Sequence, residues 1–342
     1  MHLLVIRTSA MGDVALTTPV ITALSKKYPD ISITLVTRSS FAPFFSSVKG
    51  LKLFLVDFTG RHKGLAGLFR LYADLVIQGR SDHIIDMHDV LRTKILRLIF
   101  RMSGKPVSVI DKGRLEKQEL IRGRNKAKLK HTVERYCDVF AKAGFPVVPE
   151  TGLTITPTSE AIGTVSDLLL FAGVTNIGVA PFARHPLKIW PEEYMLRLLS
   201  MISDEHKVRF WLFGGADEHE RLNKMQASLP GSYVVSGRHN LSEELALMTR
   251  LNLMISMDSS NMHMAALCGI KVVSIWGGTD PLTGFGAWQQ PEEFAIRIPV
   301  EDLTCRPCTI YGKGECRRGD FACMMWLTPE KIFERLIHLS VL

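Results

Sequence analysis

Short apolar runs alternate with amphipathic stretches along the first half of the chain. Residues 3–6 form an apolar run, and apolar positions recur at helical spacing from about residue 14 to 27. Further apolar runs predict strands at 31–36, 53–56 and 83–86, and a basic amphipathic helix is predicted at 90–102. Strands that alternate with helices imply βαβ units and a parallel sheet.

The alternation stops at "VVPETGLTITPTSEA", where prolines and threonines replace the periodic pattern. After this break it restarts, with strands expected at 177–180, 209–213, 233–235, 253–256 and 272–275 and helices at 191–203 and 242–249. The sequence therefore predicts two doubly wound α/β domains, residues 1–155 and 156–342. Residues 329–342 read as an amphipathic helix that either caps the second domain or crosses back to the first.

Length and charge restrict the kind of protein. The 342 residues suffice for a core in each of two domains, and the net charge of +8 favours anionic partners: nucleic acid, a phosphate-rich small molecule or an acidic membrane surface. No apolar run reaches 18 residues, and Arg7 and Asp13 interrupt the apolar N-terminus, so we expect a cytoplasmic protein. The basic stretch 111–131 suits a solvated or mobile loop, or a patch that meets an acidic substrate.

Ligands of open parallel sheets bind beyond the carboxyl ends of the strands. Five stretches follow predicted strands there: "RTSAMGD", "PFARHPLKIWPEE", "FGGADEHE", "SMDSSNMHMAALCG" and "IWGGTDP". In the fourth, a helix start with Ser259 and Ser260 could bind phosphate, and His263 lies one turn from Ser259. The alternative is that Asp258 or Ser259 only caps the helix; similarly, Asp13 could be a helix-capping carboxylate or a catalytic one.

Several familiar sites are missing from the sequence. It contains no G-x-G-x-x-G after the first strand, no P-loop, no HExxH and no G-x-S-x-G. These absences disfavour dinucleotide-dependent oxidoreductases, P-loop NTPases, zinc peptidases and serine hydrolases. The basic residues are not interleaved with aromatics in a recognisable module, so we expect no nucleic-acid partner.

Four of the six cysteines are close together near the C-terminus. Cys305, Cys308, Cys316 and Cys323 follow a C-x2-C-x7-C-x6-C pattern. Four thiols in a short cytoplasmic loop suit a structural zinc better than disulfides, and a reduced, metal-free cluster is the alternative.

Taken in order, these motifs resemble the ADP-heptose:lipopolysaccharide heptosyltransferase family, glycosyltransferase family 9. The resemblance covers almost the whole chain, through the stretches "VIRTSAMGDVALTTPVITAL", "DHIIDMHDVLRTKIL", "HTVERYCDVF", "PLKIWPEEYMLRLL", "LFGGADE", "MDSSNMHMAALCGIKVVSIWGGTDP" and "CRPC". It implies a GT-B fold, in which two Rossmann-like domains face a cleft. The N-terminal domain would bind the acceptor and the C-terminal domain the sugar nucleotide.

The resemblance also implies roles for individual residues. Asp13 matches the general base, and Lys188 matches the lysine that neutralises the diphosphate. The remaining expected donor-binding residues are Arg184, Glu218, Asp258, Ser259, Ser260 and His263, with Asp217 or Glu220 as alternatives to Glu218 for the ribose contact. The expected acceptor-binding residues are Ser9, Met11, Gly12 and Arg92.

The implied reaction is inverting, metal-independent transfer of heptose, or a related sugar, from an ADP-sugar to a lipopolysaccharide inner-core acceptor, with peripheral contact to the inner membrane. No cofactor is expected for catalysis. Two departures affect the donor sugar: Ser260 stands where the family usually has glycine, and Gly277–Pro281 reads GGTDP where the family has G-P-T-D-P. The alternatives are a GT-B transferase for another sugar nucleotide and glycan, and a non-catalytic sugar-nucleotide or polyanion binding protein.

Overall fold

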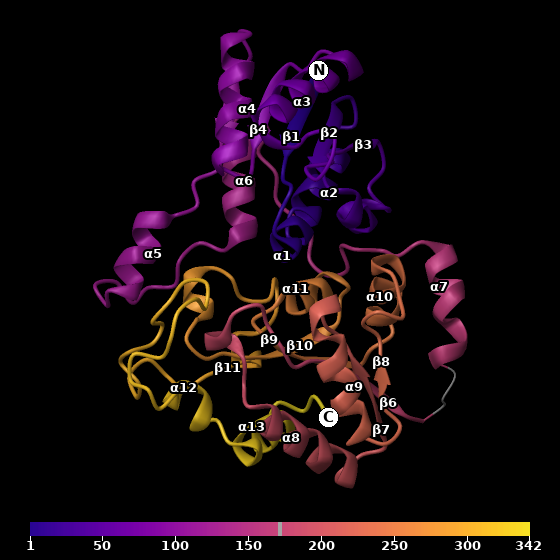
Figure 1. Ribbon diagram of the computed structural model, residues 1–342, viewed down its shortest axis with the longest axis vertical. Coiled ribbons are helices and arrows are strands. Elements are labelled where there is room, and N and C mark those ends of the chain that lie inside the picture. The colour runs from indigo at the N-terminus through magenta and orange to yellow at the C-terminus, as the bar shows by residue number, and fades with distance from the viewer. Residues whose placement is uncertain (170–172) are drawn as a thin grey trace. The chain divides into compact units, whose positions relative to one another are not determined.

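Two parallel sheets organise the chain in a computed structural model that describes residues 1–169 and 173–342 (Figure 1). Each sheet belongs to a separate unit. The first unit contains residues 1–112 and 132–156, and the second contains residues 113–131 and 157–342. The predicted division at residue 155 places the segment 113–131 in the first domain, whereas the structure groups this segment with the second unit.

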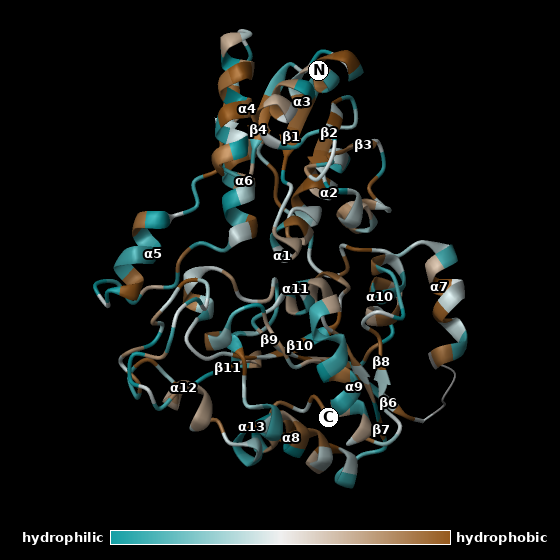
Figure 2. Cartoon of the chain, viewed as in Figure 1, coloured by the Kyte–Doolittle hydropathy of each residue, from teal (hydrophilic) through white to brown (hydrophobic). Residues whose placement is uncertain are grey.

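The first unit has a five-stranded sheet in the order β3-β2-β1-β4-β5, with every neighbouring pair parallel. The strands are β1 (His2–Ile6), β2 (Ser32–Thr37), β3 (Leu51–Leu55), β4 (His83–Asp86) and β5 (Val107–Val109). The helices are α1 (Met11–Ala15), α2 (Thr18–Lys27), α3 (Gly64–Gln78), α4 (Leu91–Met102) and α6 (Thr132–Lys142). Hydrophobic residues are concentrated along β1 and β2 (Figure 2), as expected for strands covered on both faces.

The second unit has a six-stranded parallel sheet in the order β11-β10-β9-β6-β7-β8. Its strands are β6 (Thr175–Ala180), β7 (Val208–Leu212), β8 (Tyr233–Val234), β9 (Leu253–Met257), β10 (Lys271–Ile275) and β11 (Ala295–Ile296). Its helices are α5 (Arg114–Ile121), α7 (Ser159–Val165), α8 (Glu192–Glu205), α9 (His219–Ala227), α10 (Leu241–Met248), α11 (Ser260–Leu267), α12 (Ala322–Met325) and α13 (Pro329–His338). These two sheets confirm the predicted α/β class with two doubly wound units.

Two expectations about helices and loops are corrected. The helix predicted over residues 14–27 is two helices, α1 and α2, and Pro19 occupies the first turn of α2, where its missing N–H costs no helical hydrogen bond. The basic stretch 111–131 is not simply a solvated loop. It contains α5, in which Lys117 and Leu120 are buried, and the ammonium of Lys117 lies 4.0 Å from the centroid of the Phe285 ring.

The C-terminal helix α13 packs against α8 within the second unit. Thr328 caps it by accepting a hydrogen bond from the Lys331 N–H, and Pro329 starts its first turn. Its apolar stripe, which includes Ile332 and Leu336, is buried in the core of this unit, so α13 covers the second unit. No helix in the described part of the chain is long and apolar enough to cross a bilayer.

Candidate active site

In both sheets, the strand order reverses beside the first strand of the unit, which is β1 in the first sheet and β6 in the second. In the first unit, β2 and β3 lie on one side of β1, whereas β4 and β5 lie on the other. In the second unit, β7 and β8 lie on one side of β6, whereas β9 and the strands after it lie on the other. Loops diverge at such reversals and leave a crevice at the carboxyl edge, where ligands of doubly wound sheets bind. The structure therefore indicates one candidate half-site in each unit.

In the first unit, the half-site is built around an ion pair just after β1. The Arg7 Nη2 atom lies 2.7 Å from Asp13 Oδ2; the Arg7 side chain is buried, whereas that of Asp13 is 30% exposed. Arg7 also donates a 2.6 Å hydrogen bond to the Met87 carbonyl, beyond the end of β4. The Tyr136 hydroxyl of α6 donates to the main-chain carbonyl of Asp13, 3.1 Å away. The partly exposed carboxylate of Asp13 is thus oriented by the nearby Arg7, while Met87 and Tyr136, from distant parts of the chain, hold Arg7 and the main chain of Asp13.

Charge at this half-site follows from these contacts. Burial opposes the charge on Arg7, but Asp13, together with Tyr136 and Asp86, outweighs this effect, and the pKa of Arg7 is raised above its usual value. The positive neighbour in turn favours the ionised, proton-accepting form of the Asp13 carboxylate. Asp13 lies in the first turn of α1, as predicted, and its ion pair with Arg7 gives it an orienting partner that the capping interpretation does not need.

His88 is a site residue that the sequence analysis missed. Its ring nitrogens lie 3.1 Å from the Thr8 hydroxyl and 3.1 Å from the Ser9 hydroxyl. Burial, reinforced by the nearby charge of Arg7, lowers the pKa of His88 to about 3, so the imidazole is neutral at pH 7. A neutral imidazole donates at one nitrogen and accepts at the other, and His88 therefore orients the two hydroxyls differently.

The predicted acceptor-binding residues are not all in one place. Ser9 is held by His88, and Met11 and Gly12 form the start of α1 beside Asp13. Arg92, in the first turn of α4, is exposed, and its guanidinium carbon lies 4.5 Å from the centroid of the Phe58 ring. All four follow the carboxyl ends of β1 or β4, which are adjacent because Ile6 is opposite Asp86. Their binding of an acceptor stays a prediction.

In the second unit, the half-site joins the loops that follow β6, β9 and β10. Lys188 Nζ lies 2.8 Å from Asp258 Oδ2, and the Thr279 hydroxyl donates a 2.8 Å hydrogen bond to the same oxygen. The side chains of Lys188 and Asp258 are 16% and 6% exposed, and Thr279 is fully buried. The structure thus joins the second, fourth and fifth stretches that sequence analysis singled out.

Three positively charged side chains act on His185, in the same loop as Lys188. The pKa of His185 is lowered by burial and then by the charges of Lys188, Lys313 and Arg184, all of which act on its ring. Arg184 was expected from the sequence, but Lys313 was missed because it belongs to the cysteine-rich segment, far from Lys188 along the chain. Cations that act together on one loop can help to neutralise a diphosphate.

The start of α11 supplies further polar groups. Ser259 is the N-cap residue of α11; its hydroxyl makes no capping bond within the helix and lies 3.2 Å from the Ser256 hydroxyl. Ser260 is the first residue of α11, and His263 is buried one turn later. His263 acts electrostatically on His131, a residue that sequence analysis did not single out. Burial, with this smaller effect of His263, lowers the pKa of His131 to about 4.

Glu218 is the most constrained of the three acids after β7. Its Oε2 accepts a 2.7 Å hydrogen bond from the Gly215 N–H, and burial raises its pKa. Asp217 and Glu220 are exposed, and Glu220 pairs with Lys224. Glu218 therefore already stabilises the loop, and its contact with a ribose stays a prediction.

The four late cysteines line one cavity of about 250 Å³, together with Arg306. All four, Cys305, Cys308, Cys316 and Cys323, are free thiols. Burial raises the pKa of Cys308 and raises that of Cys323 to about 12. Among residues 1–169 and 173–342, no three His, Cys, Asp or Glu side chains are already arranged around a common metal position.

Each half-site suits one part of a transfer reaction. An oriented, partly exposed carboxylate can accept a proton, and clustered cations beside a helix start can stabilise a departing diphosphate. The family model that matches residues 74–308 is described as glycosyltransferase family 9 (heptosyltransferase). This match agrees with the resemblance found in the sequence.

Individual relatives match nearly the whole chain. Lipopolysaccharide heptosyltransferase 1 of Pseudomonas aeruginosa is 25% identical, over 98% of this chain and 97% of that protein. A glycosyl transferase family 9 structure from Veillonella parvula superposes with a TM-score of 0.78 at 22% identity, covering 99% of this chain and 96% of that one. The Escherichia coli ADP-heptose lps heptosyltransferase II structure gives 0.70 at 20% identity, covering 99% and 98%. The two structural matches support the same fold.

Proposed function

Since the chain belongs to glycosyltransferase family 9, we propose that this enzyme transfers heptose from ADP-heptose to an acceptor in the lipopolysaccharide inner core. The names of its relatives support this donor and acceptor. The observation that carries the proposal is the Lys188–Asp258–Thr279 cluster at the reversal of the second sheet, in a loop where the charges of Lys188, Lys313 and Arg184 act on His185.

In the proposed mechanism, Asp13 accepts the proton of the attacking acceptor hydroxyl, and Arg7 orients the carboxylate. The hydroxyl oxygen forms a bond to the anomeric carbon of the heptose while the bond from that carbon to the β-phosphate oxygen breaks. The electron pair of the broken bond leaves with ADP, whose developing charge Lys188 and its neighbouring cations stabilise. A single displacement of this kind inverts the anomeric configuration.

We propose that the transfer needs no divalent cation, because Lys188, Arg184 and Lys313 provide positive charge for the diphosphate. Activity should persist in excess EDTA. A rate that collapses in EDTA and returns with Mg²⁺ or Mn²⁺ would contradict this part of the proposal.

The experiment that tests the function measures nucleotide release from a panel of sugar nucleotides, with and without a lipopolysaccharide core acceptor. Asp13→Asn removes the base, and Asp30→Asn, an exposed residue in the turn after α2, is the control with the same change of charge. We expect acceptor-dependent ADP release from ADP-heptose that falls about 10²–10⁴-fold in Asp13→Asn and is unchanged in the control.

Other outcomes of this experiment separate the alternatives. Turnover with another donor would keep the reaction class and change the substrate. Nucleotide binding without any turnover, unaffected by Asp13→Asn, would identify a binding protein.

We also propose that the first unit meets the cytoplasmic face of the inner membrane through α3 and α4, which pack together. These helices expose large apolar side chains: Leu65, Phe69, Val76, Ile77, Leu91, Leu98 and Met102. The exposed Arg92, Lys94 and Arg101 of α4 complement anionic headgroups. Wild-type protein should float with anionic vesicles, and Ile77→Ser/Met102→Ser should not. Flotation that is equal for both proteins would contradict this contact.

Finally, we propose that the four clustered cysteines hold a structural zinc. Four thiols lining one cavity match the all-cysteine donor set of many structural zinc sites. In the part of the chain that the structure describes, no three of these thiols are already arranged around a metal position. Zinc binding must therefore draw the thiols together. Metal analysis of purified protein should find about one zinc per chain, lost in Cys305→Ser/Cys308→Ser. Protein that contains no zinc, even after incubation with it, would leave the cluster as free thiols.

A further inference from the structure

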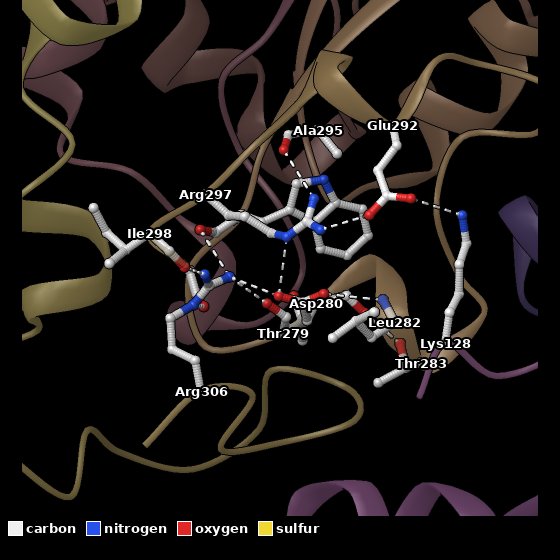
Figure 3. A network of polar contacts seen from close by, with 12 residues as sticks. Lys128, Thr279, Asp280, Leu282, Thr283, Glu292, Ala295, Arg297, Ile298 and Arg306 are labelled. Carbon is white, nitrogen blue, oxygen red and sulfur yellow. Dashed lines mark hydrogen bonds and ion pairs between the residues drawn. The ribbon is translucent and has the colours of Figure 1, made fainter. Parts of the chain in front are cut away.

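Residues 306–309 directly follow Cys305 and include Cys308. This segment binds the loop that follows β10. The buried Arg306 guanidinium donates to the Gly277 carbonyl at 2.6 Å, the Thr279 carbonyl at 3.0 Å and the Trp276 carbonyl at 3.3 Å. It also donates to the carbonyl of Ile298. Figure 3 shows this guanidinium directed at Thr279 and Asp280.

Backbone groups of the same segment complete these contacts. The N–H groups of Cys308 and Thr309 both donate to the Gly278 carbonyl, at 3.0 and 3.2 Å. Four successive carbonyls, from residue 276 to residue 279, are therefore bound by residues 306–309. A loop whose carbonyls are held in this way has little freedom to change its path.

The charge of Arg306 is balanced inside the protein. Asp280 is fully buried, and its Oδ2 lies 3.4 Å from Arg306 Nη2 and 3.4 Å from Arg297 Nε. Arg297 reaches the same carboxylate from a more exposed position, where it also pairs with Glu292 and donates to the Ala295 carbonyl. Arg297 thus shares the electrostatic partner of Arg306, but its backbone contact is with β11 rather than with the 276–279 loop.

The bound loop connects directly to the donor half-site. The side chain of Thr279 donates to Asp258, which pairs with Lys188, and the Gly278 N–H donates to the Leu187 carbonyl at 2.9 Å. Gly312 of the cysteine-rich segment packs against Lys188: a Cβ on Gly312 would lie 2.6 Å from Lys188 Cγ. Lys188 is therefore held in two ways. Gly312 of the cysteine-rich segment packs against its side chain, and Asp258, which accepts from Thr279 of the bound loop, pairs with its ammonium group.

We propose that Arg306 is a positioning residue for the donor half-site: by binding the carbonyls of the 276–279 loop, it holds Thr279, and through Thr279 it holds Asp258 against Lys188. This inference rests on the proposed function only where it identifies the ligand of that half-site as a nucleoside diphosphate. The mechanical link from Arg306 to Asp258 stands on the contacts alone. Arg306 itself contacts no substrate in this scheme.

The test compares Arg306→Lys with the matched control Arg297→Gln. Lysine keeps the charge beside Asp280 but lacks the planar fork that binds several carbonyls at once. We expect the dissociation constant for ADP, measured by calorimetry, to rise about tenfold to a hundredfold in Arg306→Lys and less than about twofold in Arg297→Gln. The KM for the sugar nucleotide should rise in parallel, with the KM for the acceptor unchanged.

Thr279→Val is a second variant, because it removes the hydroxyl link to Asp258 while nearly keeping the buried volume. It should weaken ADP binding as well. The double variant Arg306→Lys/Thr279→Val should be no weaker than the worse single variant, since both changes break one path. Additive losses, or normal ADP binding in Thr279→Val, would overturn the proposal.

Hydrogen exchange separates failure of this inference from failure of the proposed function. In Arg306→Lys, peptides covering residues 185–190, 256–262 and 276–281 should exchange faster than in the wild type, whether or not the protein binds ADP. If the wild type binds no nucleotide, the proposed function fails and the exchange result still decides the role of Arg306. Unchanged exchange in all three peptides would show that Arg306 does not position this loop.

Discussion

The guanidinium of Arg7 lies 2.7 Å from the carboxylate of Asp13, and Arg7 is almost completely buried. We expect Arg7→Met to leave Asp13 in place but without its orienting charge. The turnover number should fall about tenfold to a hundredfold, with the affinity for ADP unchanged. Steady-state kinetics and ADP calorimetry measure the two quantities.

The same pair predicts a difference between two substitutions of Asp13. Asp13→Ala removes both the charge and the hydrogen-bond acceptor that face the buried guanidinium of Arg7, whereas Asp13→Asn keeps an acceptor there. Urea unfolding should show Asp13→Ala to be less stable than Asp13→Asn by about 1–3 kcal/mol. Equal stability of the two variants would mean that a hydrogen-bond acceptor at position 13 beside Arg7 contributes nothing to folding.

Lys188 and Asp258 should have separable effects on the donor. Lys188→Met removes the cation and leaves Asp258 buried, so kcat/KM for the sugar nucleotide should fall about 10²–10³-fold. Asp258→Asn keeps the Lys188 ammonium but removes the carboxylate that positions it, so kcat/KM should fall less than in Lys188→Met. Lys207→Met, an exposed residue between α8 and β7, is the control with the same loss of charge. A full loss in Asp258→Asn with a mild effect of Lys188→Met would reverse the proposed roles.

His88 predicts a loss of stability in acid. Its pKa falls from 6.5 to about 3 on folding, so the native state favours the neutral ring. The stabilisation is fully present above pH 6.5 and is lost as the pH falls toward 3. When the pH is lowered from about 7.5 to about 5, the free energy of unfolding should decrease in both proteins. The decrease should be about 1–2 kcal/mol smaller in His88→Gln than in the wild type. His338→Gln, exposed at the end of α13, should behave like the wild type.

Glu244 on α10 predicts the opposite dependence. Burial raises its pKa from 4.5 to about 7, so the native state favours the protonated acid. This stabilisation is present below pH 4.5 and is lost as the pH rises through 7. Glu244→Gln should therefore be more stable than the wild type at about pH 8, by about 1–3 kcal/mol, and nearly equal to it at about pH 4.5. Thermal unfolding at both pH values, with the exposed Glu205→Gln as control, measures the difference.

The order of strands and helices could be predicted because it depends on local patterns. The apolar strands at 3–6 and 253–255 need burial on both faces, and this requirement appears in the sequence as continuous apolar runs. The loops after them were recognised as candidate sites because parallel strands place their carboxyl ends at one edge. Asp13, Lys188 and Asp258 were found in this way, together with the family resemblance.

Several contacts of the site residues could not be predicted, because they come from distant parts of the chain. Tyr136 reaches Asp13 across 123 positions, and His88 reaches Ser9 across 79. No periodicity links such positions. Likewise, the basic stretch 111–131 was expected to be solvated because its composition is polar, and only the packed structure shows Lys117 buried with its ammonium over Phe285.

The sequence by itself determined the two doubly wound units and the loops that carry the chemistry, since hydrophobic periodicity and turn residues act over a few neighbouring positions. The tertiary structure alone decided that Tyr136 holds the main chain of Asp13 and that Arg306 binds the loop that carries Thr279. Buried charges and polar groups need partners, and which partners they find depends on how distant segments pack.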